Sequence, residues 1–224
     1  LQGGSISPKH GSASPKYPFQ STDIETVVNL GAGMDCRAYY LPNLAETTYF
    51  HVDHPLVIHK KKKKMKKIFG SLPDNIVYVP VDFQKQTLDD VLKNAGYHLS
   101  SKTLFIWEAV TQYISKEAND SIFKYIRQAA PGSKLVFSYV IKSFFEGKYN
   151  NDGIKKLAKR FLKKNKPIFI TGFDPADMKD YLSKNSLMLI EDIGSIEMQE
   201  RYSKLVDLDF LRTVKEFVLA EVIR

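Results

Sequence analysis

The chain has 224 residues, of which 43% are hydrophobic, and its formal net charge is +8 at pH 7. This length and composition favour one domain with a sizeable core and leave little room for a second. The lone cysteine, Cys36, excludes an intrachain disulfide and is typical of a reducing compartment, so we expect a cytoplasmic protein. No apolar run approaches the roughly 20 residues that cross a bilayer, which argues against a membrane span.

Most of the positive charge comes from residues 60–67, which include seven lysines. The rest of the chain is close to neutral, and this distribution argues against a general nucleic-acid surface. A lysine-rich helix face is more often solvated than a binding site. One alternative stays open, in which this basic face docks an acidic partner and the chain is a binding module without turnover.

Residues 1–20 are rich in Gly, Ser and Pro, and we expect a flexible tail or a segment boundary there, followed by one domain over residues 21–224. The first predicted element is a buried strand over residues 26–30 that runs into Gly31-Ala32-Gly33. Glycine permits a sharp turn and a close approach of a ligand. A short helix begins at Asp35 and is limited by Pro42, and a strand, a glycine turn and a helix start together form a nucleotide cradle.

The next elements alternate between strands and helices. We predict strands over residues 48–53, 76–83, 103–108 and 134–140, and helices over residues 55–69, 87–95 and 116–130, the last with Ser115 as its N-cap. A basic helical insertion near residues 144–166 interrupts the alternation and is placed to cover a site. A helix capped by Asp174 and strands over 187–190 and 216–222 follow, the last of them an edge strand that suits an antiparallel place. This order predicts a parallel sheet with helices on both faces.

Glycine or a carboxylate stands at four successive strand ends, namely Gly31, Asp53, Asp82 and Glu108. Ligands of such sheets bind at the carboxyl ends of the strands. Asp53 lies about 20 residues after the glycine turn, where an acidic residue accepts hydrogen bonds from ribose hydroxyls. Asp82 and Phe83 offer an acceptor for an exocyclic amine beside an apolar ring face, and Glu108 suits a cationic group.

This row favours an adenosyl ligand that is cationic and carries no phosphate, as S-adenosylmethionine is. The sequence has no Gly-Lys-Ser/Thr, so a P-loop nucleotide site is disfavoured. Cys36 stands where a dinucleotide fold has its third glycine, which disfavours a nicotinamide-dependent oxidoreductase.

Plainer interpretations are available for the same residues. The glycines serve tight turns in many proteins, and aspartates after strands often cap helices, as Asp53 and Asp82 would. The spacing of His51, His54 and His59 fits no standard ligand motif, so we expect no metal site. Cys36 lacks a base placed beside it by the sequence and is expected to be a small packing residue.

Several motifs resemble the leucine carboxyl methyltransferase family, and more closely its microbial branch of O-methyltransferases. The resemblance is most specific in residues 28–35 and 49–55, continues in residues 105–114 and 172–175, and covers residues 26–222. It implies a Rossmann-like class I methyltransferase fold of the α/β class, with six parallel strands, an antiparallel seventh strand and helices on both faces. Family members usually carry an N-terminal helical segment with an arginine for the cofactor carboxylate, whereas the first arginine here is Arg37.

The resemblance also implies roles for the residues at the strand ends. The turn Gly31-Ala32-Gly33 would contact the cofactor, with Gly31 at its methionine part, and Asp53 would hold the ribose. Asp82 and Phe83 would hold the adenine, and Glu108 would lie near the methionine or sulfonium end.

We therefore expect an S-adenosylmethionine-dependent O-methyltransferase that acts on a carboxylate or hydroxyl of a small molecule. A protein C-terminal leucine carboxylate is the alternative acceptor. The sequence shows no pair of histidine and carboxylate that would act as a general base, which favours an acceptor that is already ionised. No catalytic residue is assigned, and Tyr113 and Tyr139 are the candidates for the acceptor side.

Overall fold

A computed structural model describes residues 23–40, 47–83, 85–148, 152–163, 166–194, 197, 200–201 and 215–223. The predicted tail over residues 1–20 and the predicted helix end at Pro42 lie outside the described residues. Among the helices that are described, none is both long enough and apolar enough to span a bilayer.

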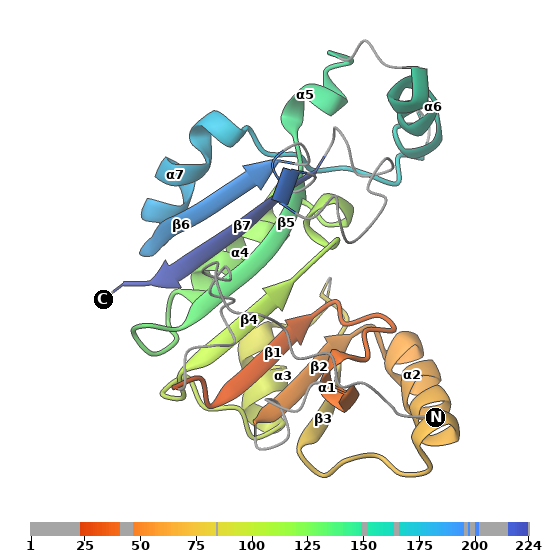
Figure 1. Cartoon of the computed structure of the whole chain (residues 1–224), viewed down its shortest axis with the longest axis vertical. Coiled ribbons are helices and arrows are strands. Elements are labelled where there is room, and N and C mark those ends of the chain that lie inside the picture. Colours follow the sequence, from red (N-terminus) through yellow and green to blue (C-terminus); the bar gives the residue numbers. More distant parts are fainter. Residues whose placement is uncertain are drawn as a thin grey trace, which may run out of the picture.

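One seven-stranded sheet forms the centre of the molecule, with the strand order β3-β2-β1-β4-β5-β7-β6 (Figure 1). Strands β1 to β5 pair in parallel, whereas β7 is antiparallel to both of its neighbours, β5 and β6. Six strands therefore run in one direction and β7 in the other, which confirms the predicted strand directions. The predicted edge position of this last strand was wrong, because β7 pairs with both β5 and β6, and β6 forms the edge. The strands are β1 (Thr26–Leu30), β2 (Thr48–Asp53), β3 (Ile76–Pro80), β4 (Thr103–Trp107), β5 (Lys134–Val140), β6 (Leu187–Gly194) and β7 (Lys215–Val222).

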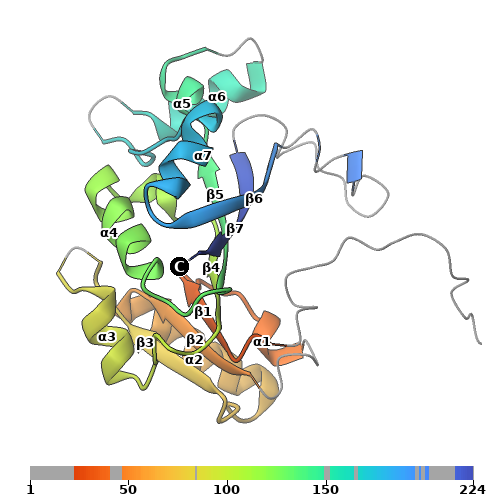
Figure 2. The ribbon, with the colours of Figure 1, turned by 90° about the vertical axis from the view of Figure 1, so that its left-hand side faces the viewer.

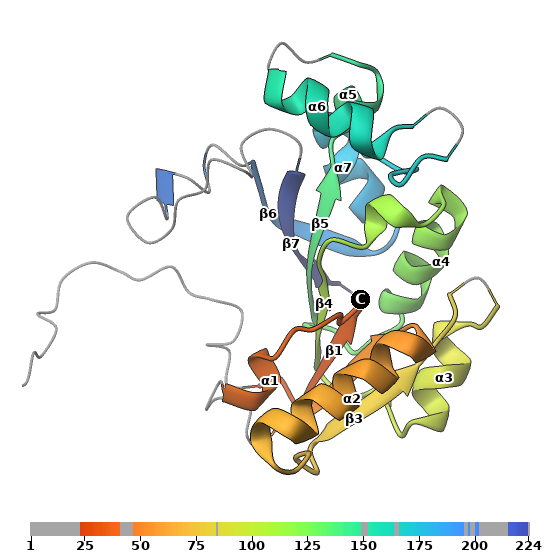
Figure 3. The same cartoon turned by 90° about the vertical axis from the view of Figure 1, so that its right-hand side faces the viewer.

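Helices cover both faces of this sheet. They are α1 (Arg37–Tyr40), α2 (Pro55–Phe69), α3 (Leu88–Asn94), α4 (Lys116–Ile126), α5 (Lys142–Phe145), α6 (Asp152–Phe161) and α7 (Pro175–Ser183), with a short 3-10 turn at Thr111–Tyr113. Helices α3, α4 and α7 lie on one face and α1 on the other (Figures 2 and 3). Every residue of the central strands β1 and β4 is buried, as expected for parallel strands that are covered on both faces.

Local signals fix several boundaries where the sequence predicts them. The Ser115 side chain accepts from Ala118 N and begins α4, and Asp174 accepts from Ala176 N and begins α7. Helix α2 ends at Gly70, whose φ of 79° favours glycine. Several predicted boundaries were wrong by more than one residue. Helix α1 begins at Arg37 instead of Asp35, and β3 ends at Pro80 instead of residue 83. Helix α4 ends at Ile126 instead of residue 130, and β6 continues to Gly194 because it pairs with β7 past an irregularity at Leu189 and Glu191.

Helices α5 and α6 lie in the stretch where the sequence predicts a helical insertion. They pack into a small apolar cluster of their own, which includes Phe144, Ile154 and Phe169. Figure 1 shows this cluster beyond the carboxyl end of β5. The insertion therefore stands at the same edge of the sheet as the predicted ligand residues.

Candidate functional site

The glycine turn after β1 is closed by tight backbone contacts. Gly31 N donates to Val52 O at 2.8 Å, and Asp35 N donates to Ala32 O at 2.9 Å. Gly31 has a φ of 70°, and a Cβ at this position would lie 2.2 Å from Cγ2 of Val110. Both the backbone conformation and the lack of space therefore require glycine here, as the sequence predicts.

Val110 reaches Gly31 because the exit of β4 bends sharply. Ala109 has a φ of 58°, which is unusual for a residue other than glycine, and its N–H donates to the Ser138 hydroxyl at 2.9 Å. The Thr111 hydroxyl donates to Ser138 O at 2.9 Å. These bonds to β5 hold a strained residue between Glu108 and Val110 and direct the chain back over the turn.

A cleft of about 380 Å³ opens beside the turn at the carboxyl ends of the strands. It is lined by Gly31, Asp53, His54, Val81, Asp82, Phe83, Val110 and Ile114. The fold therefore brings together four residues that the sequence singles out, from three different strand ends. The lining includes two aspartates and neither lysine nor arginine, a composition that suits a ligand without phosphate. A second hollow of about 460 Å³ shares Phe83 but lies between α3 and α4, away from the turn.

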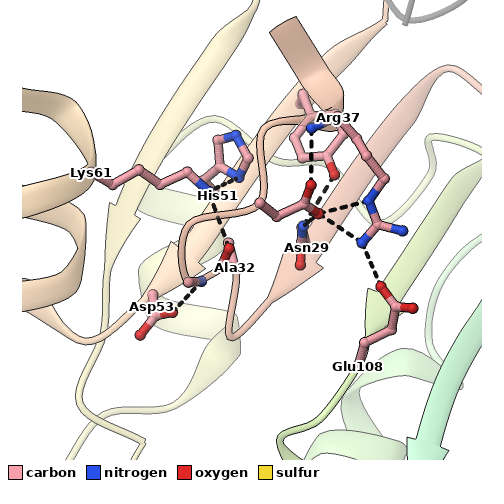
Figure 4. A network of polar contacts seen from close by, with 10 residues as sticks. Asn29, Ala32, Arg37, His51, Asp53, Lys61 and Glu108 are labelled. Atoms are coloured by element: carbon pink, nitrogen blue, oxygen red, sulfur yellow. Dashed lines mark hydrogen bonds and ion pairs between the residues drawn. The ribbon is translucent and has the colours of Figure 1, made fainter. Parts of the chain in front are cut away.

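Asp53 joins the glycine turn to the end of β2. One carboxylate oxygen accepts from Gly33 N at 2.7 Å (Figure 4). The other accepts from His54 N at 2.6 Å. The cap of α2 is His54, whose Nδ1 accepts from Leu56 N at 3.4 Å. Asp53 is therefore not the cap of α2, and each of its oxygens keeps a lone pair for a further donor.

Glu108 finds its cationic partner in Arg37, with which it forms an ion pair (Figure 4). The Arg37 guanidinium also donates to Asp35 at 2.8 Å, and Asn29 donates to the same carboxylate at 2.6 Å. Burial lowers the pKa of Arg37, but the Asp35 hydrogen bond and the charge of Glu108 outweigh it and raise that pKa above its usual range. This network of Asn29, Asp35, Arg37 and Glu108 was not predicted from the sequence. The polar Asn29 within an otherwise apolar strand was a signal for it.

A second polar contact lies beneath the turn. His51 and Lys61 are both fully buried, and Lys61 Nζ lies 3.0 Å from His51 Nδ1 and 3.1 Å from Ala32 O. Burial and the neighbouring Lys61 cation lower the pKa of His51 to about 3. Burial lowers the pKa of Lys61 to about 8, although the carboxylates of Asp35 and Asp53 act in the opposite direction. The expectation that the lysine run is simply a solvated face was therefore wrong for Lys61.

The two acceptor-side tyrosines do not line the cleft. The Tyr113 side chain is exposed and packs edge-on against Phe169, with 5.3 Å between ring centroids. The Tyr139 hydroxyl is buried and donates to Asp192 on β6 at 2.9 Å, and burial raises the pKa of Tyr139. Cys36 is a free, half-buried thiol. The predicted acceptor roles of Tyr113 and Tyr139 remain predictions.

The model of the leucine carboxyl methyltransferase family matches residues 18–127, which include the glycine turn, Asp53, the Asp82-Phe83 pair and Glu108. The chain is similar to this family over those residues, which make up just under half of its length. Among its curated relatives is the "Putative S-adenosyl-L-methionine-dependent methyltransferase YktD" of Bacillus subtilis (strain 168), which is 27% identical over 177 residues. The match covers 78% of this chain and 58% of YktD, so the chain spans less than two thirds of that relative.

Solved structures share the fold of this chain at low sequence identity. The methyltransferase SibL in its apo form has a TM-score of 0.60 and 13% identity, over 92% of this chain and 53% of SibL. Magnesium protoporphyrin IX methyltransferase (ChlM) from Synechocystis PCC 6803 with bound SAH has a TM-score of 0.54 and 12% identity, over 88% of this chain and 74% of ChlM. These likenesses establish the class I methyltransferase fold.

The first prediction concerns the space at Gly31. We expect Gly70→Ala to lower the free energy of unfolding by about 1–2 kcal/mol, because only the positive φ is strained there and no atom lies within 4 Å. Gly31→Ala adds the overlap with Val110 and should cost about 1–3 kcal/mol more. Urea unfolding measures both. In a double-mutant cycle with Val110→Ala, the Gly31→Ala cost should shrink toward that of Gly70→Ala, and an undiminished cost contradicts the clash.

The second prediction follows from the buried neutral His51. The unfolded chain gains a proton at this residue near pH 6.5, whereas the folded chain resists protonation until about pH 3. The free energy of unfolding should therefore fall with decreasing pH in this window, by up to about 1.4 kcal/mol per pH unit from this group. Chemical unfolding at several pH values should show a shallower fall for His51→Asn. His59→Asn, at an exposed position of α2, is the matched control. If the free energy of unfolding depends on pH in the same way for wild type and His51→Asn, the buried neutral state assigned to His51 is refuted.

Proposed function

We propose that this chain contains the cofactor site of an S-adenosylmethionine-dependent O-methyltransferase, which methylates a carboxylate or hydroxyl oxygen of a small molecule. The observation that carries the proposal is the cleft at Gly31, where Asp53, Asp82 and Phe83 meet without lysine or arginine in the lining. The name of YktD and the SAH bound to ChlM support the same cofactor.

The residues of the cleft fit an adenosyl group by their chemistry. Asp53 keeps acceptor capacity on both oxygens after its bonds to Gly33 N and His54 N, and ribose hydroxyls are suitable donors. Phe83 offers an apolar ring, and Asp82 an acceptor, at the neighbouring strand end. Gly31 lines the same cleft with its backbone alone, because it carries no side chain.

The groups behind the turn fit the amino-acid end of the same cofactor. Glu108 and Asp35 share the Arg37 cation between them, so the cluster of these three side chains carries a net negative charge. A cationic sulfonium or ammonium group is stabilised beside such a cluster. Arg37 in turn provides guanidinium donors of the kind that bind a carboxylate.

When bound, S-adenosylmethionine supplies a methyl group activated by its sulfonium sulfur. The protein's part is to bind and orient the two reactants and to exclude water. A carboxylate acceptor needs no general base, in keeping with a cleft lining whose only histidine, His54, caps α2. The family name makes a protein C-terminal leucine carboxylate the alternative acceptor.

The third prediction tests cofactor binding. Calorimetry should show binding of S-adenosylhomocysteine to the full chain, and Asp53→Ala should weaken it about 10- to 100-fold, because a hydrogen bond to a charged group contributes about 1.5–3 kcal/mol. Asp180→Ala removes an exposed carboxylate on α7 and should leave binding unchanged. Absence of binding by the wild type, or equal binding by Asp53→Ala, rejects the proposal and favours the binding-module alternative.

The fourth prediction tests the acceptor class. The chain is incubated with methyl-labelled S-adenosylmethionine and separate panels of small carboxylic acids, phenols and peptides that end in leucine. Alkali releases methanol from methyl esters but not from aryl ethers, so the label distinguishes a carboxylate from a hydroxyl acceptor. We expect label in the small-molecule panels. Label confined to the peptides would move the assignment to the protein-carboxylate alternative, and label in no panel would contradict the proposed transfer.

A further inference from the structure

The seven-lysine stretch divides into two parts in the fold. Six of its lysines are exposed on α2, whereas Lys61 has no exposed surface. Lys61 shares the inward face of the helix with Ile58 and Met65, at the spacing of successive turns. A cation stands where the helix pattern otherwise has apolar side chains.

The Lys61 ammonium extends from α2 to the Ala32 carbonyl of the glycine turn (Figure 4). It donates to Ala32 O at 3.1 Å and lies 3.0 Å from His51 Nδ1. Because His51 is neutral, its Nδ1 can accept from the ammonium, and Nε2 then carries the ring proton. Burying a cation is costly, and an apolar side chain of similar length often replaces a buried ion pair without loss of stability. Stability alone therefore does not account for a lysine at this position.

The turn is thus held from two sides by side chains of successive elements. Asp53, at the end of β2, accepts from Gly33 N at 2.7 Å, and Lys61, from α2, donates to the carbonyl of the preceding residue, Ala32. These two bonds fix the two groups of one peptide unit, the Ala32 carbonyl and the Gly33 N–H. Without the Lys61 bond, the Ala32 carbonyl is held by Asp35 N alone, so the peptide is less constrained, and with it the orientation of Asp53 toward the cleft.

We propose that Lys61 is a positioning residue, whose ammonium holds the Ala32–Gly33 peptide and thereby keeps the turn and Asp53 in the geometry that binds the adenosyl cofactor. This inference rests on the proposed function for the identity of the ligand. It goes beyond that function by assigning cofactor affinity to a residue that does not line the cleft.

A pH dependence follows from the groups that face Lys61. Burial lowers its pKa most, Asp35, Asp53 and Cys36 raise it, and Arg37 lowers it, which leaves the pKa at about 8. His51 stays neutral throughout this range. The ammonium is therefore present below about pH 8 and lost above it, so cofactor affinity falls as the pH rises through that value.

The fifth prediction compares Lys61→Met with Lys60→Met, a matched control at the neighbouring exposed position. At pH 7, Lys61→Met should weaken binding of S-adenosylhomocysteine in calorimetry about 10- to 100-fold, whereas Lys60→Met should bind as the wild type does. At pH 9 the wild type should approach the affinity of Lys61→Met. The amino group of the ligand also titrates with pH. Because wild type and variants bind the same ligand, comparing their affinities at one pH cancels this contribution. Equal binding by Lys61→Met and wild type at pH 7 overturns the proposal.

A second measurement needs neither a variant nor a ligand. In the wild-type protein, NMR follows the side-chain nitrogen of Lys61 and the backbone amide of Gly33 from pH 6.5 to 9.5. We expect the two titrations to share one midpoint near pH 8. A Gly33 amide that does not change while Lys61 deprotonates overturns the positioning role. Wild-type protein that shares this midpoint but binds no S-adenosylhomocysteine would instead refute the proposed function.

Discussion

The contact between Gly31 and Val110 is the constraint on which the site depends. Strand β1 lies between β2 and β4, where the order of strands reverses, and ligands of open α/β sheets bind at such a point. The strained Ala109 directs Val110 over the turn, so that an added Cβ on Gly31 would lie 2.2 Å from it. The backbone of β1 and the exit of β4 are thereby closer than other residues would permit. Gly31 and Val110 thereby form one wall of the cleft that Asp53 and Asp82 also line.

Charge is organised around the same turn. The two cations at the turn each have a partner, as the cost of burying charge requires. Arg37 lies between Asp35 and Glu108, and Lys61 lies between Ala32 O and His51. The cations stand behind the turn, while Asp53 and Asp82 line the cleft in front of it. The acidic side of the site therefore faces the ligand.

The sequence predicted most of the fold because its signals are local. Apolar runs mark the strands, and the caps Ser115 and Asp174 mark the starts of two helices. The strand ends that carry Gly31, Asp53 and Asp82 lie together because the carboxyl ends of parallel strands share one edge of the sheet. The partners of Arg37 and Lys61 could not be predicted in this way. Arg37 and Glu108 are 71 residues apart, and no local pattern in the sequence predicts that they meet. The sequence likewise does not show that Tyr139 bonds to Asp192 on β6, which is 53 residues away.

The lysine run shows why composition and position must be considered separately. The composition of residues 60–67, seven lysines in eight residues, suggests a solvated or polyanion-binding face. Six of these lysines do lie on the surface. The helix has 3.6 residues per turn, so a run of this length must place at least one lysine on the inward face. That position is occupied by Lys61, whose long apolar stem crosses the core while its ammonium meets the turn. One lysine-rich run therefore serves two environments, and only the fold separates the lysine that contacts the turn from those that face water.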